Sequence, residues 1–224
     1  MPRFSNPCFV RFPWLLLVLL VLLWLTGPAL AAAKPGKRLH KSKKDEVVSI
    51  TTTQGVIRLV LFDDTPLHKA NFLAKAKSGF YDGTSFHRII DNFMIQGGDS
   101  NSKDADPGND GQGRAGEGTV PAELGPGHPH RYGSVAAARM GGPAGTPSSS
   151  SQFYLVENHD GAHFLDGQYT VFGQVIQGLE VIDKIAKLPK DERDHPTVDA
   201  KMTMKVEKLK RKKISQRYGY SFNN

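Results

Sequence analysis

Cysteine is almost absent from this chain of 224 residues, in which Cys8 is the only one. Disulfide bonds therefore cannot hold the fold together, and the residues that follow Cys8 offer no thiol for catalysis. That part of the chain is also indifferent to whether its surroundings are oxidising. A sequence repeat of fixed period is lacking too, which excludes solenoid and propeller architectures.

No apolar run is long enough to make a membrane-spanning helix. The longest run, residues 14–25, has 12 apolar residues, whereas a span needs about 20. Arg3 and Arg11 precede this run, and the small residues 29–33 follow it. A basic start, a short apolar run and an Ala-x-Ala site are typical of a secretory signal peptide. We therefore predict a signal peptide at residues 1–31, the alternative being an anchor that is not cleaved.

Positive charge is scarce in the middle of the chain, although the formal net charge is +7 and the pI is about 9.4. Residues 45–199 contain 13 basic and 21 acidic residues. Residues 34–44 contain six basic residues and no acid before Asp45, and residues 200–224 contain eight basic residues and one acid. Because the excess of positive charge lies at the two ends, we predict that nucleic acid is not a partner.

The two basic ends are predicted to flank the folded domain. Residues 32–46 have almost no apolar content and are typical of a solvated linker, with a weak contact to an anionic membrane surface or another polyanion as the alternative. Residues 211–224 are predicted to be a frayed, solvated tail. Their interleaved basic and aromatic residues would also suit packing along the domain or contact with acidic partners.

Short β-strand patterns dominate the region between those ends. Residues 47–53 and 56–62 are rich in β-branched side chains and are joined through Gln54 and Gly55, which indicates a hairpin. Further strands are predicted at residues 85–90, 93–96, 134–138, 152–156, 170–176 and 202–209.

Two helices are predicted, far apart in the sequence. The first covers residues 66–78, where Thr65 can cap the helix and Pro66 can occupy its first position. The second covers residues 179–187. Many short strands with glycine-rich turns and two distant helices favour a mainly β fold, a closed antiparallel barrel.

Several cofactor and metal motifs occur without the context that they need. Residues 111–116 match the dinucleotide pattern G-x-G-x-x-G, but polar residues precede them and no helix pattern follows. Asp104, Asp106 and Asp110 resemble part of a calcium loop, yet Gly108 stands where a ligand is required. Four histidines would bind metal only if the fold brought them together: His128, His130, His159 and His163. We therefore predict no cofactor and no metal.

Residues 86–99 differ from these motifs because they set a single arginine in an apolar, strand-forming context. Their sequence is FHRIIDNFMIQGGD. Alternation along a strand would place Phe86, Arg88 and Ile90 on one face. A charge on such a face needs a defined partner or ligand. The alternative is an arginine in a surface ion pair at the edge of the sheet.

This stretch resembles the signature of the cyclophilin family of peptidyl-prolyl cis-trans isomerases, in which F-H-R-x-I is followed by two variable residues and F-M-I-Q-G-G-D. Other blocks follow in the family's order at residues 66–72, 78–83, 133–139, 151–154, 164–167 and 171–173. The resemblance defines a domain at residues 47–210 and is closest to exported bacterial members. It implies a closed eight-stranded antiparallel barrel capped by two helices.

The resemblance also implies a reaction and a site. Arg88 matches the family's catalytic arginine, which would stabilise the twisted amide of an X-Pro bond without a metal or cofactor. The matching substrate-binding positions are Phe93, Met94, Gln96, Ala138, Arg139, Gln152, Phe153, Tyr154, Phe164, Leu165 and Tyr169. Gln96 and Gln152 match side chains that orient the arginine or the peptide. The backbone of Ala138 and Arg139 matches a segment that pairs with the substrate as an added strand.

The expected substrates are proline-containing peptides and unfolded proteins outside the cytoplasm. A bacterial periplasm fits the signal peptide best, with secretion or a eukaryotic secretory lumen as alternatives. The membrane would be met only through the signal peptide or weakly through the basic ends, and the chain is expected to be a monomer. The alternative function is a binding module that holds proline-containing segments without catalysing their isomerisation.

The sequence departs from the best-known eukaryotic pattern at three aromatic positions. Tyr154 stands where that pattern has phenylalanine, Phe164 where it has tryptophan, and Tyr169 where it has histidine. These residues keep the pocket aromatic, so we expect activity to be retained. Loss of the tryptophan implies weaker binding of cyclosporin.

Overall fold

The computed structural model describes residues 43–222 of the chain. The predicted signal peptide at residues 1–31 and most of the predicted linker, residues 32–42, lie outside the described residues. Within the described part, no helix combines the length and the apolar character that crossing a membrane requires.

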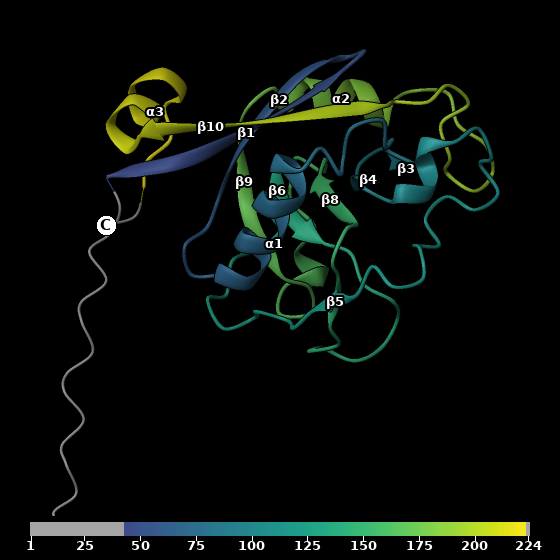
Figure 1. Ribbon diagram of the computed structural model, residues 1–224, viewed down its shortest axis with the longest axis horizontal. Coiled ribbons are helices and arrows are strands. Elements are labelled where there is room, and N and C mark those ends of the chain that lie inside the picture. The colour runs from purple at the N-terminus through teal and green to yellow at the C-terminus, as the bar shows by residue number, and fades with distance from the viewer. Residues whose placement is uncertain (1–42, 223–224) are drawn as a thin grey trace, which may run out of the picture. The chain divides into compact units, whose positions relative to one another are not determined.

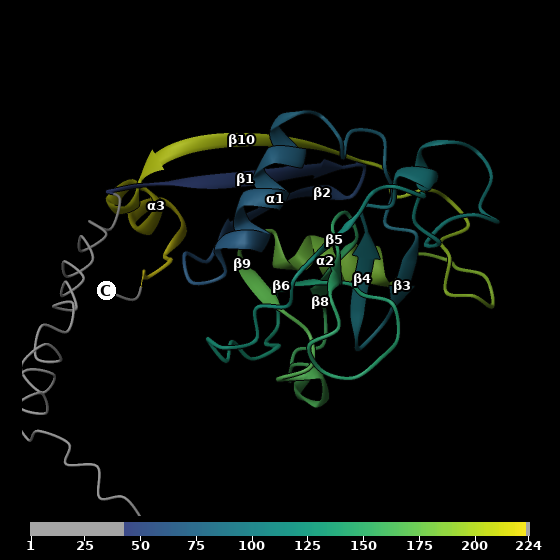
Figure 2. The same ribbon diagram turned by 60° about the horizontal axis from the view of Figure 1, so that its bottom comes forward.

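An antiparallel sheet of eight strands forms the centre of this part (Figures 1 and 2). Its strands are β1 (Lys44–Thr52), β2 (Gly55–Leu61), β3 (Arg88–Ile90), β4 (Met94–Gly97), β6 (Ser134–Ala137), β8 (Phe153–Val156), β9 (Val171–Gln177) and β10 (Met202–Lys210). Their order across the sheet is β10-β1-β2-β9-β6-β8-β4-β3, and β5 (Thr119–Val120) pairs separately with β7 (Ser148–Ser149). The predicted hairpin between β1 and β2 is confirmed by the pairing of Thr52 with Gly55.

The sheet does not close into the barrel that the sequence predicted. In the described residues its outer strands, β10 and β3, share no ladder, and the residues that precede them meet at the isolated bridge between Ser85 and Lys201. Beside this bridge, the backbone N–H of Phe86 donates to the carbonyl of Ala200 at 3.1 Å. Residues 85–87 do not continue β3 as a regular strand, so single contacts replace a ladder along this seam.

Within residues 43–222, three α-helices accompany the sheet, one more than predicted: α1 (Pro66–Lys77), α2 (Leu179–Ala186) and α3 (Arg211–Tyr218). The connections of this region also contain the short 3-10 helices η2 (Ser100–Lys103) and η3 (His163–Leu165). The first two α-helices bury apolar side chains in the same core as the strands, namely Phe72, Leu73 and Ala76 from α1 and Val181, Ile182, Ile185 and Ala186 from α2.

The start of α1 is capped by a different residue from the one predicted. Thr65 occupies the N-cap position, but its side chain makes no capping hydrogen bond. The Glu123 carboxylate instead accepts hydrogen bonds from the backbone N–H groups of Leu67 and His68, both at 3.0 Å. Its negative charge also suits the positive end of the helix dipole. A carboxylate from a distant loop therefore replaces the local cap.

The strands bury different side chains on their two faces. One face and the first two helices form the main core, whose largest fully buried side chains are Ile50, Ile57, Leu59, Tyr81, Phe86, Ile89, Ile95, Phe153, Leu155, Ile182 and Ile185. The other face carries a smaller set, the pocket-side cluster: Met94, Ala136, Ala138, Tyr154, Val156, Ala162 and Val171. Side chains alternate along β8, so Phe153 and Leu155 enter the main core while Tyr154 and Val156 enter the pocket-side cluster.

The folded part begins earlier than predicted. β1 starts at Lys44, so residues 44–46 belong to the sheet and not to a solvated linker. Asp45 is only 3% exposed, and its carboxylate lies 2.8 Å from Lys69 Nζ and 2.9 Å from Arg211 Nη2. Such a buried carboxylate is tolerated because it is paired with two cations.

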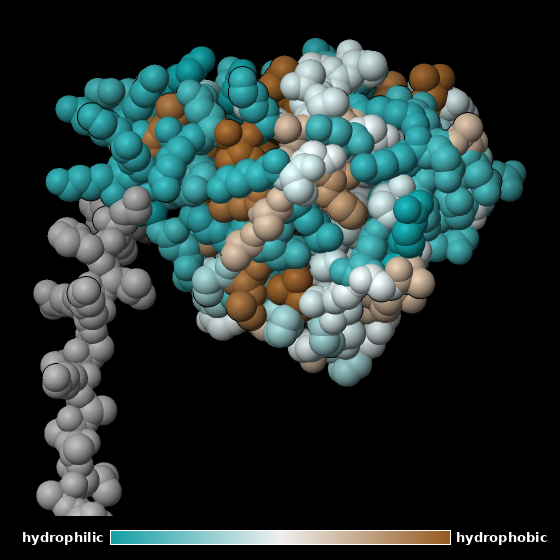
Figure 3. All heavy atoms as spheres, in the orientation of Figure 1, coloured by the Kyte–Doolittle hydropathy of each residue, from teal (hydrophilic) through white to brown (hydrophobic). Residues whose placement is uncertain are grey.

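The folded part also ends later than predicted. Residues 211–218 form α3, so the prediction of a frayed tail is wrong there, and the alternative of packing along the domain is the one observed. Ile214 is fully buried with Val47, Val60 and Leu209. The end of the molecule that carries α3 is covered mainly by hydrophilic side chains on the face shown in Figure 3, as the basic composition of this segment requires.

Candidate active site

Three neighbouring strands place side chains in one row on the pocket side of the sheet. Arg88 on β3 is paired with Gln96 on β4, and Gln96 is paired with Tyr154 on β8. Residues paired across antiparallel strands point to the same face, so these three side chains are neighbours. Two positions further along, Ile90 is paired with Met94 and continues the row with apolar side chains.

The prediction that Phe86 shares a face with Arg88 and Ile90 is wrong. Phe86 is fully buried in the main core together with Ile89, whereas Ile90 packs against the pocket-side cluster. Regular pairing starts only at Arg88, so the alternation does not extend back to Phe86. The arginine therefore stands where the chain passes from the core to the pocket side.

A pocket with a volume of about 140 Å³ lies on this side of the sheet. Its lining consists of Arg88, Phe93, Met94, Gln96, Ala138, Arg139, Tyr154, Leu165 and Tyr169. Every one of these residues belongs to the set predicted from the sequence. In the described part of the chain, the lining combines two guanidinium groups with aromatic and aliphatic side chains and includes no carboxylate.

Ring contacts hold the walls of this pocket in place. The rings of Phe93 and Phe164 lie 5.4 Å apart between centroids, and those of Tyr154 and Tyr169 meet edge to face at 6.2 Å. The guanidinium group of Arg139 lies 4.3 Å from the centroid of the Tyr169 ring, a distance that allows a cation–π interaction.

The side chain of Arg88 has no structural partner among the described residues. This side chain is exposed, and among residues 43–222 it makes no hydrogen bond and no ion pair. The surface ion pair considered from the sequence is therefore not formed. A guanidinium group in this position is free to donate hydrogen bonds to a ligand in the pocket.

The amide of Gln96, next to Arg88, is oriented by a chain of hydrogen bonds. Gln96 Nε2 donates to Gln152 Oε1 at 3.0 Å, and Gln152 Nε2 donates to the carbonyl of Gly111 at 3.1 Å. Because its nitrogen is engaged in this way, Gln96 presents its Oε1 atom as an acceptor for Arg88 or for a ligand. Gln152 thus acts on the pocket through Gln96 and does not line it.

The hydroxyl of Tyr154 is held by a relay behind the pocket. Tyr154 Oη lies 2.9 Å from His130 Nε2, and His130 Nδ1 lies 2.8 Å from Asp166 Oδ1. Since a carboxylate can only accept, His130 Nδ1 carries the proton, and His130 Nε2 accepts the hydrogen bond of the tyrosine. The polar end of Tyr154 is therefore satisfied, and its ring serves the pocket as a phenylalanine ring would.

Electrostatics keep this relay in a single protonation state. Burial lowers the pKa of His130 despite its contact with Asp166, so the imidazole is neutral at neutral pH. Although burial opposes it, hydrogen bonds from the His130 backbone and from the His163 and His130 rings lower the pKa of Asp166 to about 2. Burial, followed by the nearby Tyr169, raises the pKa of Tyr154 well above its ordinary value.

Two further predicted residues lie away from the pocket lining. Phe153 is 1% exposed and points into the main core, where its ring meets those of Phe72, Tyr81 and Phe86. Phe164 is 65% exposed and stands outside the lining, against Phe93. Phe153 therefore supports the sheet beneath the pocket, and Phe164 forms part of the rim.

The backbone segment predicted to pair with a substrate is only partly available. Ala138 N–H donates to the carbonyl of Gln152 at 3.1 Å, and its carbonyl accepts from Ser149 N–H at 2.8 Å. Among the described residues, the backbone N–H and carbonyl of Arg139 have no such partners. A peptide strand can thus be added at Arg139, while Ala138 is already used by the fold.

His130 and Asp166 were not predicted as parts of the site. The sequence showed His130 only as a weak metal candidate, because 24 residues separate it from Tyr154 and no local pattern joins them. In the described residues, the four histidines considered as metal ligands are each paired with a carboxylate, and His130 and His163 share Asp166. His128 pairs with Asp64 at 2.9 Å, and His163 pairs with Asp166 at 2.9 Å.

Comparison with known proteins identifies the family. A family model described as cyclophilin type peptidyl-prolyl cis-trans isomerase/CLD matches residues 47–206. Peptidyl-prolyl cis-trans isomerase of Acinetobacter baylyi is 36% identical over 149 residues, which cover 64% of this chain and 73% of that protein. Peptidyl-prolyl cis-trans isomerase-like 2 of Rhizopus delemar is 35% identical over 167 residues, which cover 72% of this chain but only 29% of that protein.

Solved structures agree with this result. The crystal structure of a cyclophilin type peptidyl-prolyl cis-trans isomerase of Cryptosporidium parvum has a TM-score of 0.59 and 28% sequence identity, covering 72% of this chain and 98% of that one. The same protein was also crystallised in the presence of the dipeptide Ala-Pro. The relatives come from a bacterium, a fungus and Cryptosporidium, so they do not single out exported bacterial members. The chain belongs to the cyclophilin-type peptidyl-prolyl cis-trans isomerases, enzymes of the EC 5.2.1.8 type.

Proposed function

We propose that this chain isomerises X-Pro bonds in protein substrates with Arg88 as its catalytic residue. The observation that carries the proposal is the guanidinium group of Arg88, which has no hydrogen-bond or ion-pair partner among residues 43–222 and borders a pocket lined in part by aromatic and aliphatic side chains. In this proposal the pocket holds the proline ring, and Arg88 donates a hydrogen bond to the prolyl nitrogen.

The chemistry needs only such a donor. Rotation about a peptide bond has a barrier of about 18–20 kcal/mol because it breaks amide resonance. As the bond twists, the nitrogen lone pair localises and becomes a hydrogen-bond acceptor, which it is not in the planar amide. A donor placed at that nitrogen therefore binds the twisted state more strongly than either planar isomer, and this difference lowers the barrier.

The remaining residues position the substrate in this proposal. The free Oε1 of Gln96 would steady the guanidinium group or accept from the peptide, and the free backbone groups of Arg139 would pair with the extended peptide. The Cryptosporidium relative was crystallised with Ala-Pro, a dipeptide that contains one X-Pro bond, which supports a small proline-containing ligand for this pocket.

The test is the isomerisation rate of a short proline-containing peptide with purified protein. Arg88→Ala should lower kcat/KM by on the order of 10²–10³-fold, as expected for removal of one donor that acts in the transition state. Arg88→Lys should also be strongly impaired, because an ammonium group does not reproduce the planar guanidinium fork. The unfolding free energy should change little, since among residues 43–222 the exposed side chain of Arg88 makes no hydrogen bond or ion pair, and its backbone pairing with Gln96 is kept.

A matched control is Arg58→Ala, which removes another strand arginine, one that is bonded to Gln177 at 2.8 Å and does not line the pocket. This variant should keep its full rate. An unchanged rate in Arg88→Ala would contradict the mechanism. If the unaltered chain bound the peptide without accelerating its isomerisation, the chain would be a binding module instead.

We further propose that the substrates are exported proteins. The support comes from the signal-peptide pattern at residues 1–31. The lack of cysteine after Cys8 is compatible with any redox compartment. Fractionation of cells and N-terminal sequencing of the mature protein test this proposal. Cleavage near residue 31 and recovery outside the cytoplasm are expected, and an intact N-terminus in the cytoplasmic fraction would contradict it.

A further inference from the structure

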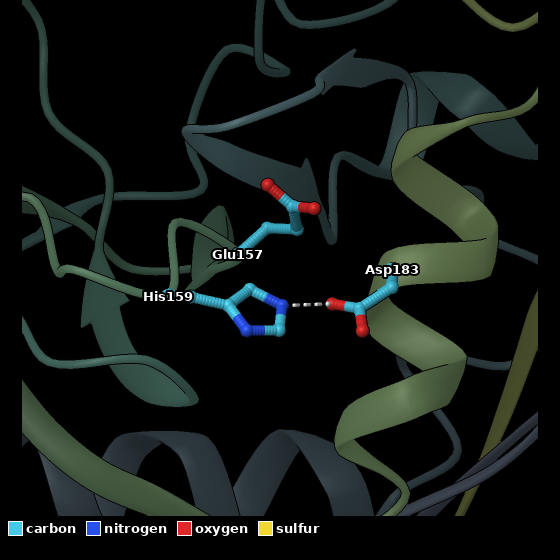
Figure 4. Close-up of side chains that lie close together, drawn as sticks. All are labelled: Glu157, His159 and Asp183. Atoms are coloured by element: carbon cyan, nitrogen blue, oxygen red, sulfur yellow. Dashed lines mark ion pairs between the residues drawn. The ribbon is translucent and has the colours of Figure 1, made fainter.

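Three side chains with metal-ligating atoms converge outside the pocket. Glu157 and His159 lie on the segment that follows β8, and Asp183 lies on α2. Each offers one ligand atom, and these atoms all lie within 4.8 Å of one another. Figure 4 shows the His159 ring pointing at the Asp183 carboxylate, with the Glu157 carboxylate beside them. We propose that this cluster binds a divalent transition-metal ion, with Zn²⁺ as the probe that fits its ligands best.

Glu157 is the group that most needs a cation. Its side chain is 3% exposed, and its Oε2 atom is buried without a hydrogen-bond partner in the described residues. A buried carboxylate oxygen without a partner costs free energy. Burial and then the charge of Asp91 raise the pKa of Glu157, and Asp183 adds to this effect. A metal ion between Glu157 and Asp183 would stabilise both carboxylates.

The other two ligands are already oriented. His159 Nε2 lies 3.4 Å from Asp183 Oδ1, and two ligand atoms of a tetrahedral site with bonds of about 2.1 Å are separated by about 3.4 Å. The Tyr132 hydroxyl donates to the two oxygens of Asp183 at 2.8 and 2.9 Å, and its ring stacks on His159 at 4.1 Å between centroids. Tyr132 is therefore a positioning residue of the type that commonly surrounds metal ligands.

The ligand types decide which ions fit. One imidazole nitrogen and two carboxylate oxygens form a set that Zn²⁺ accepts in four-coordinate sites, with water in the remaining position. Ca²⁺ prefers six to eight oxygen ligands, and Mg²⁺ demands octahedral oxygen coordination. The cluster should therefore discriminate against both. This proposal revises the prediction of no metal, which considered His159 only together with the other histidines, His128, His130 and His163.

The site would also support the backbone behind the proline pocket. The N–H groups of Glu157 and Asn158 donate to the carbonyl of Phe93 at 2.9 and 3.2 Å, and Phe93 lines the pocket. A metal ion that fixes Glu157 would thus steady the turn that carries Phe93. Metal binding itself does not depend on the proposed mechanism at Arg88.

Calorimetric titration of the full chain with ZnCl₂, after dialysis against a chelator, tests the proposal. We expect Zn²⁺ to bind at this cluster, and we expect Glu157→Gln and His159→Ala each to weaken that binding at least tenfold. His159 is largely exposed, so its replacement leaves the fold intact, and glutamine keeps the shape of Glu157. Tyr132→Phe should weaken Zn²⁺ binding by about tenfold, because it removes the hydrogen bond that orients the Asp183 ligand. Replacing Zn²⁺ with Mg²⁺ or Ca²⁺ should give no comparable binding.

The matched control is His128→Ala, which removes a histidine that is paired with a single carboxylate, Asp64, and belongs to no cluster of three ligands in the described part of the chain. This variant should bind Zn²⁺ as the unaltered chain does. Titration with Co²⁺ gives a second readout, because its visible absorption spectrum reports a nitrogen and oxygen ligand set and should be lost in His159→Ala. The proposal would be overturned if the unaltered chain did not bind Zn²⁺. It would also be overturned if Glu157→Gln and His159→Ala bound Zn²⁺ as tightly as the unaltered chain does.

Discussion

Phe153 and Tyr154 are consecutive residues of one strand, and they serve two different regions of the molecule. Phe153 lies in the main core among three other aromatic rings, where burial of apolar surface is its whole contribution. Tyr154 lines a pocket, and its hydroxyl needs the buried His130 and Asp166 to be satisfied. The core is filled for stability, whereas the pocket side leaves space open and holds its polar groups through a supporting relay.

The largest expected effect on the unfolding free energy comes from a substitution in the main core, and the same type of substitution at the pocket rim should have little effect. Phe153→Ala removes a fully buried ring and should lower the unfolding free energy by about 3–5 kcal/mol. Phe164→Ala removes a ring that is 65% exposed and should change it by less than about 0.5 kcal/mol. Chemical denaturation of the two variants measures the difference. Similar losses in both would mean that the rim stabilises the fold as much as the core does.

Acidification should destabilise the folded chain, because His87, which precedes Arg88, is buried in its neutral form. Burial, despite the nearby Asp99, lowers the pKa of His87 to about 4 from an ordinary value of 6.5. The unfolded chain therefore takes up a proton between these values and the folded chain does not, so stability is lost as the pH falls from about 6.5 to 4. The contribution of His87 to this loss should reach about 3 kcal/mol.

Denaturation at several pH values measures this dependence. Burial also lowers the pKa values of His68 and His130, so these two residues add losses of the same sign. His87→Leu should flatten the profile, and His128→Ala, which replaces a histidine outside the core, should not. A profile as steep in His87→Leu as in the unaltered chain would assign the loss to other groups.

The smallest expected effect on the unfolding free energy comes from removing the hydroxyl of Tyr154. Tyr154→Phe keeps the ring but leaves His130 Nε2 buried without a donor, which should cost about 1 kcal/mol of unfolding free energy. The isomerisation rate should stay within a few-fold, because the hydroxyl is directed to His130 and not to the substrate. A tenfold loss of rate with unchanged stability would show that the hydroxyl acts on the substrate instead.

Local patterns predicted most of the regular elements and the residues around the pocket. The hairpin at Gln54 and Gly55 and the strands of the apolar runs follow from alternation and turn chemistry that neighbouring residues specify. The match between this sequence and the cyclophilin pattern assigned Arg88 and the other pocket-lining residues to one site. Phe153 was assigned to the wrong face because a motif match does not say to which side a strand residue points.

Contacts between distant residues could not be predicted. Glu123 caps α1 from a separate loop, and no pattern near Thr65 indicates this replacement. The closure of the sheet was predicted wrongly because the irregular backbone before Arg88 depends on packing in three dimensions. The proposed metal site likewise combines Asp183 with Glu157 and His159 across 26 and 24 residues of sequence, a spacing that matches no metal motif.

The ion pairs of Asp45 have a practical consequence for anyone who trims this protein. A fragment restricted to residues 47–206, the span that the family model matches, would lose both Asp45 and Arg211. Of the two carboxylates that pair with Lys69 in the described structure, Asp63 alone would remain, and Val47 and Val60 would lose the cover of Leu209 and Ile214. Expression boundaries set by family resemblance would therefore yield a domain prone to aggregation, and a soluble product should begin before residue 44 and extend through residue 222.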